Sequence, residues 1–216
     1  MLFIDGANLY RRLLDDGARD PNLLDLRLVA RKLAGPREVV GIRYYTGKAE
    51  ASAAIDGKRV LAAQQRLFAA LARQGVDIIR GRLEKRSERN PLADELLRFL
   101  ATPPAEIDRL QPELYKALHR MAMQHREAIY WVQKAVDTAI AVEIAQMAID
   151  DQYDVAYVLS QDGDMAPGIR LARSGPHAKK VFAVGPAGRN YHIMQACDRY
   201  IVINREWLRE CYLPDR

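Results

Sequence analysis

Short apolar runs alternate with helical patterns along most of this chain, and this alternation constrains the fold more than any other sequence feature. Leu2–Ile4 and Val155–Leu159 are short apolar runs of the kind that form buried strands. Leu26–Ala34 instead carries its apolar residues at helical spacing. Parallel strands need a crossover long enough to hold a helix, so strand–helix alternation predicts an α/β fold. Its mainly parallel central sheet should be covered by helices on both faces.

The other elements follow in the same order. The predicted strands are Leu2–Ile4, Val39–Thr46, Val76–Leu83, Ala128–Val132, Val155–Leu159, Lys180–Val184 and Tyr200–Ile203. The predicted helices are Ala7–Leu14, Leu26–Ala34, Gly57–Gln74, Asp137–Ile149, Met165–Ser174, Tyr191–Cys197 and a terminal helix from Arg205. Asp25 is a good N-cap for the second helix, and Gly35 followed by Pro36 ends it.

The alternation is interrupted between Glu84 and Arg126, where proline-containing turns flank helical stretches at Leu92–Leu100 and Leu114–Gln124. We therefore predict a single domain spanning residues 1–216 with a helical insertion at about 84–126. Acids and bases balance in this insertion, which favours amphipathic packing or a homodimer surface over an RNA clamp.

Composition places the chain among ordinary globular proteins. Of its 216 residues, 49% are hydrophobic and 28% are charged, which is enough for one substantial core. The net charge of +5 makes a polyanionic partner plausible without predicting one strongly. Cys197 and Cys211 fit reduced core thiols better than a disulfide framework. Asp5, Arg11 and Arg12 interrupt the N-terminus before a signal peptide could form, so we expect a soluble cytoplasmic protein with no membrane partner.

Four aspartates follow the apolar runs of predicted strands. Asp5 and Asp137 come after the first and fourth strands, and Asp162 and Asp164 come after Val155–Leu159. An open parallel sheet places its functional crevice at the carboxyl ends of its strands, so these acids should converge. Crowded carboxylates repel one another unless a cation lies between them, and oxygen ligands suit Mg²⁺ or Mn²⁺. The sequence therefore predicts a metal site.

Each acid also has a structural interpretation. Asp5 could cap a helix or form a turn, and Asp137 could be an N-cap satisfied by backbone amides. The loop Ser160–Asp164 is more specific, because two carboxylates on a glycine-containing loop after a buried strand can turn toward one ion. Its structural alternative is a calcium-type loop or an ordinary acidic turn, and an EF-hand is excluded by the missing downstream glutamate. Ser160 could orient one of the two carboxylates through a hydrogen bond.

Basic and aromatic residues could guide a nucleic acid. Lys134 is the strongest candidate, because it lies three residues before Asp137. The other candidates are Lys48, Arg80, Arg82, Lys85, Arg86, Arg89 and Arg189, for which solvated surface charge is the simpler interpretation. Four aromatic residues could stack on bases, although their strand positions favour core packing: Tyr44, Tyr45, Tyr130 and Trp131.

Three segments together resemble the motifs of NYN domains, the bacterial LabA-like (DUF88) branch of the PIN-like nucleases. They are Phe3–Leu9, Lys134–Asp137 and Leu159–Met165, and Ala196–Ile201 resembles the final strand entry of that family. The resemblance spans nearly the whole chain. It implies a PIN-like three-layer α/β/α sandwich and an Mg²⁺- or Mn²⁺-dependent ribonuclease. The acids that match the family's site are Asp5, Asp137, Asp162 and Asp164, with Asn8 and Ser160 as their polar neighbours.

The leading hypothesis is hydrolysis of single-stranded RNA, with Asp5 and Asp162 as direct metal ligands. Asp137 and Asp164 would bind a second ion or orient the attacking water. Asn8, Ser160, Lys134, Arg82 and Arg189 form the predicted substrate-binding set. Gln161 stands where the family usually has glycine, and Met165 where it usually has phenylalanine, which leaves a non-catalytic RNA-binding or regulatory module open. Some relatives carry a monooxygenase label for pyridine compounds, so small-molecule oxidation is a third alternative.

Overall fold

The computed structural model describes residues 1–9, 23–47, 57–101, 111–188 and 191–213. The chain divides into two compact units. The first unit combines Met1–Leu83 with Gln133–Arg216 and contains most of the sheet and the helices that cover it. The second unit is Glu84–Val132 and contains a pair of helices.

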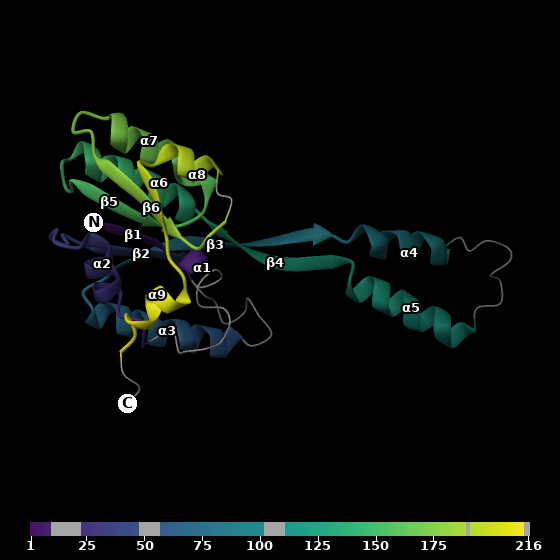
Figure 1. Cartoon of the computed structure of the whole chain (residues 1–216). Helices are drawn as coiled ribbons and strands as arrows, with labels where there is room; N and C mark the ends of the chain where they lie inside the picture. The colour runs from purple at the N-terminus through teal and green to yellow at the C-terminus, as the bar shows by residue number, and fades with distance from the viewer. Residues whose placement is uncertain (10–22, 48–56, 102–110, 189–190, 214–216) are drawn as a thin grey trace. The chain divides into compact units, whose positions relative to one another are not determined.

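Six strands of the central sheet are mutually parallel (Figure 1). In spatial order they are β3 (Asp77–Arg89), β2 (Ile42–Gly47), β1 (Leu2–Asp5), β5 (Val155–Leu159), β6 (Lys180–Gly185) and β7 (Arg199–Val202). The chain builds outward from β1 to β3 on one side and from β5 to β7 on the other. The strand order therefore reverses between β1 and β5, and such a switch point leaves a crevice at the carboxyl ends of the strands.

A seventh strand, β4 (Glu127–Lys134), lies beside β3 and runs antiparallel to it. The amide of Asn90, just after β3, donates to the carbonyl of Arg126, just before β4, at 2.9 Å. At the other end of the pair, Gly81 in β3 lies against the Lys134 carbonyl, which a Cβ at Gly81 would approach to 2.7 Å. β3 therefore extends beyond the predicted strand Val76–Leu83, because its second half pairs with β4. The sheet is mainly parallel, as predicted.

One face of the sheet is covered by α2 (Leu26–Ala34), α3 (Gly57–Arg73) and α9 (Arg205–Arg209). Beneath them, Leu2 and Ile4 of β1 pack with Tyr44 of β2 and Tyr157 and Leu159 of β5. Alternate strand residues point to opposite faces, so one run of apolar residues supplies both cores.

The other face is covered by α6 (Val136–Ile149), α7 (Ala166–Ser174) and α8 (Tyr191–Ala196). Phe3 and Tyr45 meet Ile140 and Ile144 of α6 in this core, with Val158 of β5 beside them. The predicted three-layer α/β/α sandwich is therefore confirmed. Among the described residues, no helix combines the length and apolar composition needed to cross a membrane.

Several local predictions also hold. Asp25 caps α2 through its Oδ1, which accepts the Arg27 amide at 2.9 Å. Tyr44 and Tyr45 are buried in the two cores, whereas the side chains of Tyr130 and Trp131 lie outside the described set. Cys197 and Cys211 are buried free thiols. The predicted helix Ala7–Leu14 is described only through α1 (Gly6–Leu9).

The second unit contains α4 (Pro91–Ala101) and α5 (Pro112–Gln124), close to the two predicted helical stretches. The helices lie side by side and antiparallel, as Figure 1 shows. Arg126, just after α5, binds Asp94 in the first turn of α4 with 2.9 Å between Nε and Oδ1. That this unit is an insertion within a single domain stays a prediction.

Candidate active site

Asp5 ends β1 and is almost fully enclosed, with 3% of its surface exposed. Its Oδ1 accepts the amides of Ala7 and Asn8 at 3.0 and 3.1 Å, and its Oδ2 accepts Asn8 Nδ2 at 2.6 Å. The carboxylate therefore organises the first turn of α1. The structural interpretation of Asp5 as a turn-forming residue holds, whatever further role it has.

Ser160 follows β5 and joins the two strand ends. Its Oγ donates to Asp5 Oδ2 at 3.2 Å and accepts the Asp162 amide at 3.0 Å. Asp162 in turn accepts the Asp164 amide through Oδ1 at 3.0 Å, which caps a short 3₁₀ helix, η4 (Gly163–Met165). The loop after β5 is thus linked to the loop after β1 through one buried hydroxyl.

Asp137 lies in the first turn of α6, after Ala135 in the left-handed conformation with φ of 68°. Partial burial raises the pKa of the Asp137 carboxyl, and the negative charges of Asp5, Asp162 and Asp164 raise it further. The other three aspartates are therefore each close enough to act on the charge of Asp137. Their segments are distant in sequence, and the carboxyl edge of the sheet brings them together.

Lys134, Asp137 and Asp164 line one groove with a volume of about 520 Å³, between α6 and α7. α6 and α7 pack tightly beside the groove, because a Cβ at Gly168 would lie 2.2 Å from the Ala141 carbonyl oxygen. Asp164 is exposed, and Asp137 and Lys134 are half-buried. Solvent can therefore reach Asp137 and Asp164 from this side.

The four aspartates lack cationic partners within the described residues, and no three of them are close enough to share a metal ion as they stand. In the part of the chain that the structure describes, none of them forms a salt bridge with a lysine or arginine. Within the same residues, no three acidic, histidine or cysteine side chains are grouped closely enough to hold a metal ion. Coulomb repulsion acts over longer distances than metal coordination. The acids therefore influence one another but would have to move to share an ion.

The remaining basic residues that could contact a nucleic acid have varied surroundings. Arg82 is exposed on β3, while Arg189, Lys48 and the side chain of Lys85 lie outside the described set. Arg80 stacks over the Phe68 ring at 4.8 Å, and Arg86 pairs with Glu84 at 3.5 Å. Among these residues, Lys134 lines the groove with the acids.

Gln161 points toward the β6–β7 side of the loop. Its Nε2 donates to the Pro186 carbonyl and to the Tyr200 hydroxyl, both at 3.0 Å. Gln161, which stands where NYN domains usually have glycine, thus links the Ser160–Asp164 loop to Pro186 after β6 and to Tyr200 in β7.

From the sequence, core packing is favoured over base stacking for Tyr44, and no site role is assigned to His192. Tyr44 packs so closely on Gly6 that a Cβ there would lie 2.5 Å from its hydroxyl, and burial and the Asp5 charge raise the Tyr44 pKa. His192 of α8 lies against Gly163, whose Cβ would be 3.1 Å from His192 Cβ. These contacts join segments with no fixed sequence spacing, so no local pattern could have revealed them.

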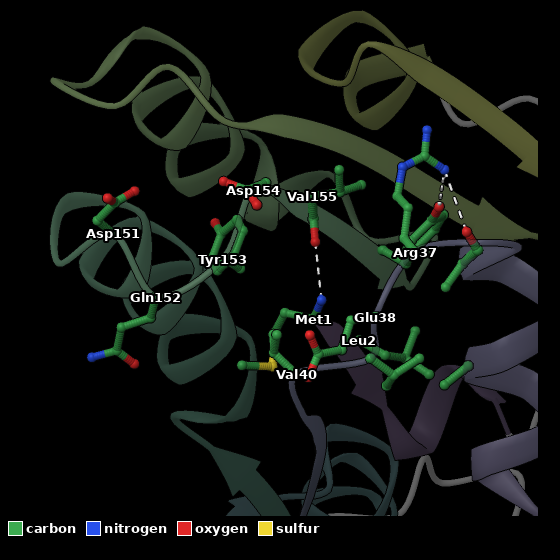
Figure 2. A pocket seen from close by; sticks show the side chains of 14 residues that line it. Met1, Leu2, Arg37, Glu38, Val40, Asp151, Gln152, Tyr153, Asp154 and Val155 are labelled. Carbon is green, nitrogen blue, oxygen red and sulfur yellow. Dashed lines mark hydrogen bonds between the residues drawn. The ribbon is translucent and has the colours of Figure 1, made fainter.

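A second cavity lies at the opposite edge of the sheet, where β1 and β5 begin (Figure 2). Arg37 lines it and donates to the Tyr157 hydroxyl at 3.4 Å, and the Met1 amino group donates to the Val155 carbonyl at 3.0 Å. Burial lowers the pKa of that amino group, and the charge of Asp154 partly offsets this effect. This cavity is separate from the acids, because parallel strands place their two ends at opposite edges.

Fold and site together define an α/β/α sandwich with an acidic cluster at its topological switch point. The family model described as the NYN domain matches residues 98–204, just under half of the chain. This match includes Lys134, Asp137 and the Ser160–Asp164 loop but leaves out Asp5 and Asn8, so it is shorter than the sequence resemblance. A search of curated proteins found no significant match. A crystal structure of a protein of unknown function from Vibrio parahaemolyticus RIMD 2210633 is similar at 15% identity and a TM-score of 0.49, covering 94% of this chain and 91% of that chain.

Proposed function

We propose that this protein is a metal-dependent ribonuclease that hydrolyses RNA phosphodiester bonds at the acidic cluster. NYN domains are a PIN-like nuclease family, generally regarded as ribonucleases that use a divalent metal. The matched region contributes Asp137, Asp162 and Asp164, and β1 contributes Asp5. Single-stranded RNA is the proposed substrate, with Mg²⁺ or Mn²⁺ as the metal.

The observation that carries the proposal is the gathering of the four acids at one edge of the sheet: Asp137 and Asp164 line one groove, and Ser160 links Asp5 to Asp162. Burial and the charges of the other three acids raise the pKa of Asp137. Excess negative charge of this kind destabilises the folded protein unless a cation relieves it. Within the described residues, no lysine or arginine pairs with these four acids. A hard divalent cation with oxygen ligands fits this donor set.

Hydrogen bonding suggests how the acids divide their roles. Both oxygens of Asp5 already accept two hydrogen bonds each, which fills their lone pairs. Within the described residues, Asp164 and the Oδ2 of Asp162 accept no hydrogen bond. Asp137, Asp162 and Asp164 would therefore hold the ion most readily. Asp5 would become a direct ligand only if Asn8 Nδ2 or Ser160 Oγ turned away.

A bound Mg²⁺ or Mn²⁺ would neutralise charge on the scissile phosphate and lower the pKa of an attacking water. Asp137 would bind the ion or orient the attacking water, and the cation would offset the neighbouring charges that raise the Asp137 pKa. Lys134, in the same groove, would bind a substrate phosphate as a point charge. Ser160 and Asn8 would keep the two acidic loops in register.

The test is cleavage of labelled single-stranded RNA in Mn²⁺, with EDTA as the control. Asp162→Asn should lower the cleavage rate at least about 100-fold while preserving the circular dichroism spectrum. Asp150→Asn is the matched control, because Asp150 follows the far end of α6 and interacts with Gln146. Cleavage by Asp162→Asn at the wild-type rate would contradict the assignment.

The second candidate is a non-catalytic RNA-binding or regulatory module. The full hydrogen bonding of Asp5 and the spacing of the described acids favour it. The same assay separates the two functions. Wild-type protein that binds the RNA but cleaves it no faster in Mn²⁺ than in EDTA would support the module.

A further inference from the structure

The helical pair of the second unit buries very little of its own apolar surface. In the described part of Glu84–Val132, the fully buried apolar residues are Ala93, Leu100 and Ala122, two of which are alanines. Helices of 11 and 13 residues are marginally stable in water without tertiary packing. This unit therefore needs more burial than its own two helices provide.

The exposed apolar side chains of α4 lie on one face of the helix. On α4, Leu92, Leu96 and Phe99 follow each other at spacings of four and three residues, which places them in one stripe. Leu92 is 73% exposed and Phe99 is 38% exposed, and Leu96 is half-buried. The adjacent stripe of α4, about a quarter turn away, holds the buried residues Ala93 and Leu100.

The same spacing repeats on α5. Leu114, Leu118 and Met121 form a stripe in which Leu114 is 49% exposed and Met121 is 51% exposed. In an antiparallel helix pair, stripes on corresponding flanks lie on the same side, so the α4 and α5 stripes form one continuous face. We call this the hairpin face; its members are Leu92, Leu96, Phe99, Leu114, Leu118 and Met121.

The chemistry of the hairpin face and its helices argues against RNA and for a second copy of this chain. The face contains no lysine or arginine, which RNA phosphates would require. α4 has two acids and one base, whereas α5 has one acid and two bases. These opposite charges are complementary when α4 of one copy lies across α5 of another, as two-fold symmetry allows.

The size of the hairpin face also fits a modest dimer. Helices of this length extend about 16–20 Å, and two adjacent helices give a face roughly as wide as it is long. A face of that size covers about 400 Å², roughly half of the 800 Å² per partner that a standard interface buries, so association through it should be weak. We expect a dissociation constant of micromolar order.

We propose that two copies of this chain associate through the hairpin face, so that two α4–α5 pairs form an antiparallel four-helix bundle. This inference rests on the second unit alone and is independent of the nuclease proposal. Association would bury the leucines, phenylalanine and methionine that the isolated unit leaves exposed.

The experiment is sedimentation equilibrium of the full chain between about 1 and 100 µM, a range that spans micromolar dissociation. Leu92→Glu and Met121→Glu should each raise the dissociation constant at least about 10-fold, because each would bury an unpaired charge. Both side chains are at least half exposed in the monomer, so its fold should be retained. Circular dichroism checks the retained helix content.

Met123→Glu is the matched control. Met123 lies two residues from Met121 and is 49% exposed, but it lines a different groove of α5 with Tyr115, Lys116, His119 and Arg120. Its dissociation constant should stay within about twofold of wild type. A wild-type chain that is monomeric throughout, or a dimer unaffected by Leu92→Glu and Met121→Glu, overturns the proposal. Loss of RNA binding in these variants without a change in mass would assign the face to RNA instead.

Discussion

Ser160 Oγ donates a hydrogen bond to Asp5 Oδ2 at 3.2 Å and connects two loops whose residues are 155 positions apart in sequence. The bond spans β1 and β5, the two neighbouring strands at which the strand order reverses. Because Ser160 also accepts the Asp162 amide, one buried hydroxyl holds acids from both loops in place.

Ser160→Ala should therefore reduce function more than stability. The free energy of unfolding should fall by about 1–2 kcal/mol, because two hydrogen bonds of a buried hydroxyl are lost. RNA cleavage in Mn²⁺ should fall at least about 10-fold, because the two loops lose their register. Urea denaturation and the cleavage assay measure the two effects.

Ser174→Ala is the control for this prediction. Ser174 donates a hydrogen bond to the Arg170 carbonyl at an exposed position at the end of α7. Ser174→Ala should leave the free energy of unfolding and the rate of RNA cleavage near their wild-type values. A Ser160→Ala variant with full activity would show that the link between the loops has no role in the site.

Asp137 should make stability depend on pH. Its native pKa lies above the ordinary value of 3.8, so on raising the pH the unfolded chain loses this proton first. The free energy of unfolding should then decrease between pH 3.8 and the native pKa and stay lowered above it. In EDTA, Asp137→Asn should consequently be more stable than wild type at neutral pH.

That difference should disappear below pH 3.8, where both states of the wild type carry the proton. Denaturation of both proteins across this pH range measures it, and Mn²⁺ should stabilise the wild type more than the variant. Equal stability of the two proteins at every pH would show that the acids do not repel Asp137 in solution.

Gly6 is constrained by Tyr44. A Cβ at position 6 would lie 2.5 Å from both Cζ and the hydroxyl oxygen of the buried Tyr44. Gly6→Ala should reduce the free energy of unfolding by about 1–3 kcal/mol, the range for overpacked sites. Gly41→Ala should be milder, because its Cβ would meet the flexible Met1 side chain at 3.0 Å.

A double-mutant cycle identifies the cause. Gly6→Ala should be less destabilising in a Tyr44→Leu background than in the wild type, because the opposing ring is gone. An identical penalty in both backgrounds would mean that Tyr44 is not the constraint.

Glu143 of α6 accepts two hydrogen bonds through one oxygen, from Arg43 Nη1 and the Tyr45 hydroxyl, both at 2.6 Å. Tyr45 is fully buried, and Arg43 Nε is a buried nitrogen without a partner within the described residues. Tyr45→Phe should lower the free energy of unfolding by about 1.5–3 kcal/mol, as expected for a bond to a charged acceptor.

Glu143→Leu should be more destabilising than Tyr45→Phe, because it leaves both donors without an acceptor. Glu113→Gln is the surface control, since the exposed Glu113–Lys116 pair should contribute little. Urea denaturation of all three variants checks this order, and a neutral effect of Glu143→Leu would contradict it.

Much of the fold follows from the sequence, because it depends on neighbouring residues. The run Val155–Leu159 is β5, and the Asp25 cap begins α2 at Leu26, as predicted from spacing and capping chemistry. Positions of the four aspartates after predicted strands also led to the expectation that they would lie near one another. In the structure, Ser160 links Asp5 to the Asp162 amide, and Asp137 and Asp164 line one groove.

Tertiary structure decided the rest. The antiparallel pairing of β4 with an extended β3, the Ser160–Asp5 hydrogen bond and the packing of Tyr44 on Gly6 join segments that no sequence spacing relates. The hydrogen bonds that fill Asp5 are likewise set by where β5 lies beside β1. By itself the sequence determined where strands, helices and acids occur, because periodicity and capping act within a few residues. How closely the acids approach, and which of them can bind an ion, depends on strand order and side-chain contacts that form only when the sheet is complete.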